Sequence, residues 1–106
     1  MNTDKKSPTI RVHIWLETEK GLFFGHGRAQ LLSKIEEYGS LKKAAENLGM
    51  SYRAAWGKIR KTEEVLGIPL VVKAGSNKEG YQLTPEGKAL KDKFILWFDE
   101  IENMRL

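Results

Sequence analysis

The stretch that decides the fold is AAENLGMSYRAAWGKIR, residues 44–60. Its first half is typical of the end of a short helix, which Gly49 interrupts, and Ser51 can cap a second, basic helix. Ala45 and Ala55 are small enough to let two helices cross closely, and Gly49 can take the positive φ of a tight turn. The stretch therefore predicts two short helices joined by about three residues, a helix-turn-helix.

Before this stretch, the sequence predicts a β-hairpin and one helix. Residues 10–17, IRVHIWLE, alternate apolar and polar side chains, which is the pattern of a half-buried strand. Residues 22–25, LFFG, follow a turn-forming TEKG and provide a return strand. Apolar side chains then recur at helical spacing over residues 28–38, and Gly39 can end that helix.

After this stretch, the sequence predicts a second hairpin and a long final helix. The basic helix would end at Gly67, and β-prone pieces at 70–73 and 81–83 flank a loop rich in turn residues. Thr84 can cap a last helix that Pro85 begins and that runs nearly to the end. The order of elements is that of a winged helix-turn-helix, an α+β fold that is mainly α.

The composition suits one domain. The chain has 106 residues, of which 41% are apolar, and we expect residues 1–8 to form a mobile tail and residues 9–106 a single domain. There is no cysteine, which excludes disulfides and thiolate metal ligands. No apolar run approaches the ~20 residues of a membrane span. We therefore expect a cytoplasmic protein that does not associate with membranes.

Positive charge is concentrated on one element. The net charge is +4, and residues 51–61 hold four basic side chains and no acidic one, whereas residues 84–106 hold four basic and five acidic. Electrostatic binding of a polyanion needs such a concentration. Lys42, Lys43 and Arg53 also oppose the dipoles of the helices that they begin, and a phosphate bound there would make them favourable.

No group of residues indicates catalysis or a metal site. His13 and His26 are the only histidines, and they lack the spacing and partners of metal ligands. The GHG at 25–27 lacks the GK[ST] ending of a phosphate loop. The glutamate pairs at 36–37 and 63–64 are better interpreted as solvated helix charges than as catalytic carboxylates. We expect no enzyme, no cofactor and no small-molecule site.

The motifs also resemble those of a known family. They are GS at 39–40, AA at 44–45, LGMSY at 48–52, AW at 55–56 and LTPEG at 83–87. Over residues 10–105 the chain resembles the N-terminal DNA-binding domain of molybdenum-responsive ModE-type transcriptional regulators and, more distantly, the LysR-type domain. The resemblance implies a winged helix-turn-helix that dimerises and binds operator DNA.

The chain departs from this family in two ways. It ends after the last helix, without the oxyanion-binding domains of full-length ModE-type proteins, so we expect no molybdate site. Thr62 stands where LysR-type helices usually carry a leucine, so we expect the end of that helix to pack differently.

The expected function is sequence-specific binding of double-stranded DNA by a homodimeric transcriptional regulator. The candidates for DNA contact lie at the helix starts, on the basic helix and in the wing: Ser40, Lys42, Lys43, Ser51, Tyr52, Arg53, Trp56, Lys58, Arg60, Lys61, Lys73, Ser76, Asn77 and Lys78. Arg53 either reads a guanine edge or contacts a phosphate. Trp56 could contact DNA or pack under the wing, and we favour packing. The remaining basic residues suit phosphates, and the wing suits the flanking backbone or minor groove.

The last helix carries an apolar seam, because large apolar residues recur at alternating steps of four and three. We expect its beginning, from Leu90 to Phe94, to pack within the protomer and its far end to form the dimer. The candidates for the dimer interface are Phe94, Trp97, Phe98, Ile101 and Met104. The alternative function is a winged-helix module that binds another protein without specific DNA binding. Apolar or acidic residues on the exposed helix face and wing would favour that alternative.

Overall fold

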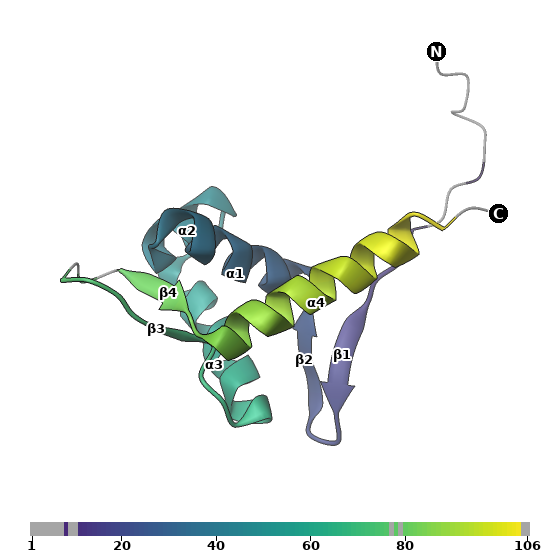
Figure 1. Cartoon of the computed structure of the whole chain (residues 1–106), viewed down its shortest axis with the longest axis horizontal. Coiled ribbons are helices and arrows are strands. Elements are labelled where there is room, and N and C mark those ends of the chain that lie inside the picture. Colours follow the sequence, from purple (N-terminus) through teal and green to yellow (C-terminus); the bar gives the residue numbers. More distant parts are fainter. Residues whose placement is uncertain (1–7, 9–10, 77, 79, 105–106) are drawn as a thin grey trace, which may run out of the picture.

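The computed structural model describes residues 8, 11–76, 78 and 80–104. Apart from Pro8, the expected tail lies outside these residues, as does Asn77. The described part contains two hairpins and four helices in the expected order (Figure 1). The elements are β1 (Trp15–Thr18), β2 (Gly21–Gly25), α1 (His26–Tyr38), α2 (Leu41–Asn47), α3 (Tyr52–Leu66), β3 (Val71–Lys73), β4 (Tyr81–Leu83) and α4 (Pro85–Glu102). The predicted winged helix-turn-helix is therefore confirmed.

The first strand is shorter than the sequence predicts. β1 pairs with β2 only from Trp15 to Thr18, in antiparallel register. Residues 11–14 belong to no strand, so the expected strand over 10–17 is wrong for them. Their side chains still alternate between exposed and partly buried. Alternating burial of side chains shows that one side of an extended segment is covered. It does not require that a neighbouring strand pairs with the segment.

The last three helices begin at hydroxyl caps, and the sequence predicts two of these caps, Ser51 and Thr84. Three hydroxyl groups accept a hydrogen bond from the backbone N–H three residues later: Ser40 from Lys43 (3.1 Å), Ser51 from Ala54 (3.0 Å) and Thr84 from Gly87 (2.9 Å). Each bond satisfies a first-turn N–H that has no partner inside its helix. These caps fix where α2, α3 and α4 begin.

The helix-turn-helix rests on the small residues that predicted it. Ala45 of α2 and Ala55 of α3 are at most 1% exposed. Gly49, in the turn between the two helices, has a φ of 70°. Ile59 is buried in the core, and Met50 packs against it. The two helices can thus cross closely, with α3 presented on the outside of the pair.

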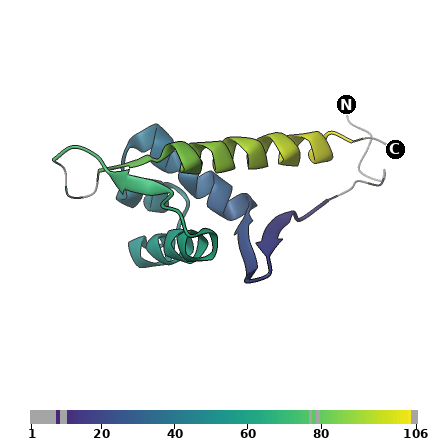
Figure 2. The same cartoon turned by 60° about the horizontal axis from the view of Figure 1, so that its bottom comes forward.

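The core lies where α4 crosses α1 and the first hairpin. Phe24 of β2 and Phe94 of α4 meet edge to face, with ring centroids 5.3 Å apart, and both rings are almost fully buried. Figure 2 shows α4 along one side of the molecule, with α3 and the β1–β2 hairpin projecting from the other. Because Phe94 has no surface left to offer a second chain, its expected place in a dimer interface is wrong.

An ion network also joins α1 to α4. The largely buried ammonium of Lys91 lies 2.6 Å from Glu36 Oε1 and 2.5 Å from Asp92 Oδ1. Lys88 adds a second contact to Glu36 at 3.1 Å. Hydrogen bonds from Lys91, and to a smaller extent from Lys88, hold the pKa of Glu36 below its ordinary value. The two carboxylates offset the cost of burying the Lys91 charge, so the network fixes how α4 lies on α1.

The base of the wing, which is the β3–β4 hairpin, is hydrogen-bonded to the start of α4. The Thr84 N–H donates to the Leu70 carbonyl over 2.9 Å, and the Thr84 hydroxyl donates to the Pro69 carbonyl over 2.8 Å. Gly87 lies so close to the Leu70 carbonyl that a Cβ on it would collide with the oxygen. The base of the wing is therefore packed directly against the beginning of α4.

Candidate nucleic-acid interface

The third helix buries one face and presents the opposite one. Ala55, Ile59 and Thr62 are its buried residues, and they recur at helical spacing. The residues half a turn away are exposed, namely Arg53, Ala54, Gly57, Arg60, Lys61 and, in the last turn, Glu64. We call the first five of these residues the outward face of α3. It carries three cations, and the acidic Glu64 follows them only near the end of the helix, so the first three turns have the charge that a surface binding a polyanion requires.

Thr62 attaches α3 to the first hairpin. Its hydroxyl donates to the Phe23 carbonyl over 2.6 Å, and the threonine is 1% exposed. The same carbonyl accepts a hydrogen bond of 3.2 Å from Arg28 Nη1 of α1. A leucine at position 62 would leave this bond unmade, so the threonine changes how the second half of α3 is held.

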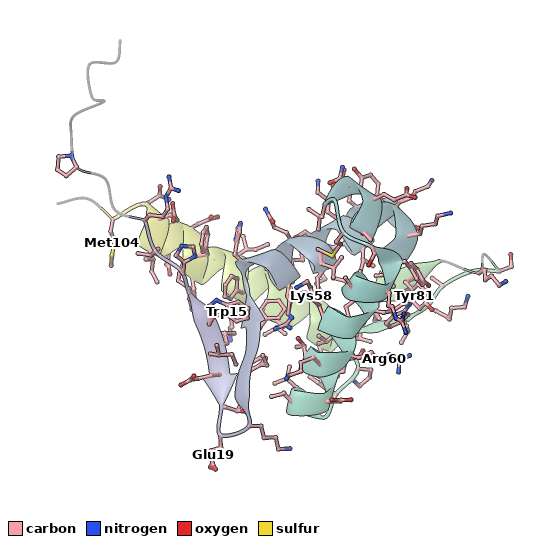
Figure 3. All side chains as sticks on the ribbon, turned by 180° about the vertical axis from the view of Figure 1, so that it is seen from behind. Trp15, Glu19, Lys58, Arg60, Tyr81 and Met104 are labelled. Atoms are coloured by element: carbon pink, nitrogen blue, oxygen red, sulfur yellow. The ribbon has the colours of Figure 1, made fainter. Side chains whose placement is uncertain are left out.

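The wing rests on α3 through aromatic rings. Trp56 and Tyr81 of β4 meet edge to face, with centroids 5.1 Å apart, and the Arg60 guanidinium lies 4.8 Å from the Trp56 ring centroid. Trp56 is partly buried against the core. This is the packing that the sequence favours for Trp56. It places the wing beside the outward face of α3 (Figure 3).

Tyr81 is a contact residue that sequence reasoning missed. Burial raises the pKa of its phenol, and the nearby Tyr52 raises it further by charge repulsion and a side-chain hydrogen bond. Tyr81 thus joins the wing to two aromatic residues of α3, Tyr52 and Trp56. The available signal was an aromatic residue in a strand that follows a turn, but this pattern does not reveal its partners.

The other predicted residues of α2 and the wing differ in how exposed they are. Lys42 and Lys43 are exposed in the first turn of α2. Ser40 is 8% exposed and its hydroxyl caps α2, so little of it is left for a ligand. In the wing, the Lys73 ammonium donates to the Lys78 carbonyl over 2.7 Å, and both side chains are exposed.

Residues 27–88 match the family model for bacterial regulatory helix-turn-helix proteins of the lysR family. The chain belongs to the LysR family. This is a family of regulatory proteins, not of enzymes. Within the described residues, none of the LysR-type helices has the length and apolar character that crossing a lipid bilayer demands.

The expected ModE-type relationship is also confirmed. The chain is 35% identical over 77 residues to the molybdenum transport protein ModE of Azotobacter vinelandii, covering 71% of this chain and 28% of that protein. It is 38% identical over 72 residues to the molybdenum-pterin-binding protein MopB of Rhodobacter capsulatus, covering 66% of this chain and 27% of that protein. The chain thus spans less than a third of the length of these two relatives.

A solved structure shares the LysR-type fold. The BenM DNA-binding domain in complex with benA site 1 DNA superimposes with a TM-score of 0.60. The two chains are 24% identical, and the match covers 74% of this chain and 84% of that one. This likeness shows the fold.

Lys58 does not join the other cations of the LysR-type helix. It lies on the opposite side of α3 from Arg60 (Figure 3) and lines a small cavity with Phe24 and Arg28. Arg28 is a second residue that sequence reasoning missed: its guanidinium lies 5.6 Å from the Trp15 ring centroid. Burial lowers the pKa of Arg28, and its Nε has no hydrogen-bond partner within the described part of the chain.

The far end of α4 and the two residues after it carry the exposed apolar residues of the predicted seam. Trp97 is 42% exposed and Met104 68%, while Ile101 is partly buried. Leu96, which sequence reasoning missed, is 57% exposed. Phe98 is partly buried, because its ring stacks on His26 with centroids 4.3 Å apart. Of the predicted interface, Trp97 and Met104 therefore present the most surface.

Proposed function

We propose that this LysR-family protein binds specific sequences of double-stranded DNA as a homodimer and regulates transcription in the cytoplasm. The observation that supports this most is the outward face of α3, which gathers Arg53, Arg60 and Lys61 with no acidic residue between positions 51 and 61. That the related BenM domain was crystallised with DNA supports the same class of ligand. The acid-free stretch at 51–61 also speaks against a module that binds another protein.

The proposed docking follows the geometry of the fold. The N-terminal half of α3 enters the major groove, as the second helix of this motif does. Lys42 and Lys43 then lie at the start of α2, where a phosphate can meet both their charges and the free N–H groups of the helix. Lys73 and Lys78 bring the wing to the flanking backbone, which positions the protein without reading sequence.

The proposed dimer uses the far end of α4. This helix has 18 residues and is therefore ~27 Å long. The core covers its middle at Phe94, but Leu96, Trp97 and Met104 stay exposed. Exposed apolar residues gathered at one end of a molecule mark an interaction site. A second copy of α4 would cover them and place two recognition helices on successive turns of DNA.

Selection of bound sequences from random duplex DNA tests the proposed function. A homodimer that reads bases should enrich a motif with two related halves, separated by about one helical turn or a multiple of it. The unselected pool serves as the control for non-specific binding. Failure to enrich any motif, with measurable binding to the pool, would contradict sequence-specific recognition.

Two substitutions separate base reading from backbone contact. Arg53→Ala should cost ~1–3 kcal/mol on the selected sequence and relax specificity at one base pair. Lys78→Ala should weaken binding to all sequences alike and lower the slope of log K against log[salt] by about 1. Lys93→Ala, which removes an exposed cation from α4, is the control and should change little. Equal losses by Arg53→Ala on specific and random DNA would make Arg53 a phosphate contact.

A further inference from the structure

Gly57 stands in the interior of α3, where glycine is disfavoured relative to alanine because it loses more conformational freedom on folding. The two structural reasons for a glycine do not apply here. Its backbone does not take a positive φ. A Cβ built on it would meet nothing within 4 Å. The fold therefore gains nothing from the missing side chain, and the reason for it must lie outside the protomer.

The position of Gly57 indicates which surface of the protomer its missing side chain affects. It is exposed on the outward face of α3, between Arg53 one turn before and Lys61 one turn after. Ala54, three residues earlier, is also small and exposed. Lys58 and Arg60 reach to opposite sides of the helix (Figure 3). The backbone is thus left bare at the centre of a face whose edges are cationic.

We propose that Gly57 is a specificity-determining residue, at which the backbone of α3 comes closest to the base-pair edges of bound DNA. This inference rests on the proposed function. A side chain at position 57 would hold the helix away from the floor of the major groove. Arg53, the proposed base-reading side chain one turn earlier, would then lie too far from its base to form a hydrogen bond. The longer side chains that contact phosphates could still reach them.

Gly57→Ala tests this proposal, because its effects on stability and on binding should have opposite signs. The alanine should raise the midpoint of thermal unfolding, by roughly 4–8 °C. It should weaken binding to the selected sequence about tenfold, as the loss of one base contact does. Binding to random DNA should stay within about twofold of wild type, since phosphate contacts carry it.

The matched control is Gly27→Ala in the first turn of α1. Gly27 is also exposed, and a Cβ on it would also meet nothing within 4 Å. This variant should be at least as stable as wild type and bind both DNAs unchanged. A Gly57→Ala protein that binds the selected sequence as wild type does, or loses both DNAs equally, would overturn the inference. A wild-type protein without sequence preference would instead overturn the proposed function.

Discussion

Replacing Phe94 with alanine is expected to remove about 3–5 kcal/mol from the free energy of unfolding. The ring is fully buried and meets Phe24 edge to face, so its removal leaves a cavity where α4 crosses the first hairpin. Domains of this size are stable by only about 5–15 kcal/mol, so the loss would be a large part of the total. Urea denaturation followed by circular dichroism measures it.

Lys93→Ala is the matched control on the same helix. Lys93 is exposed and lies outside the proposed dimer contact, so its truncation should change the free energy of unfolding by about 0.5 kcal/mol or less. A Phe94→Ala protein with an unchanged denaturation midpoint but a weakened dimer would contradict the structure. Such a result would return Phe94 to the interface between two chains.

Replacing Ile101 with glutamate is expected to separate the proposed dimer and leave each protomer folded. Ile101 is only partly buried in the protomer, so a glutamate there remains solvated in a single chain. At the seam between two α4 helices, the same carboxylate would be desolvated without a partner. Binding to the selected sequence should fall by roughly 10²–10⁴, because the second half-site is no longer held close.

Sedimentation at about 50 µM protein, a concentration that favours the paired state of all but weak dimers, distinguishes the two states. Ala89→Glu adds the same charge at an exposed position near the other end of α4, and it should remain dimeric. Circular dichroism checks that both variants are folded. A wild-type protein that sediments as a monomer, yet binds its selected sequence tightly, would contradict dimerisation through α4.

The parts of the fold that follow from neighbouring residues could be predicted. A capping hydroxyl acts on an N–H three residues away, so Ser51 and Thr84 mark the starts of α3 and α4 from sequence alone. Gly49 could be placed in the turn for the same reason, since its φ depends on its own backbone. The small residues nearby showed that two helices must cross.

The parts that depend on distant contacts could not be predicted. Phe94 and Trp97 share one seam, and no local pattern shows how far along α4 the first hairpin reaches. The hydrogen bond from Thr62 to Phe23 spans 39 positions, and the contact of Trp56 with Tyr81 also joins separate elements. Such contacts are set by the path of the whole chain, which the periodicity of a single element does not record.

The hydrogen-bonded contact at Leu70 has a mechanical consequence for the proposed dimer. Because the Leu70 carbonyl accepts the Thr84 N–H and lies against Gly87, the wing cannot swing without turning the start of α4. Each protomer of the proposed dimer would then turn as one unit, with the DNA-binding face at one end and the dimer contact at the other. A signal that alters the spacing of the two DNA-binding faces would therefore have to change the angle between the two protomers.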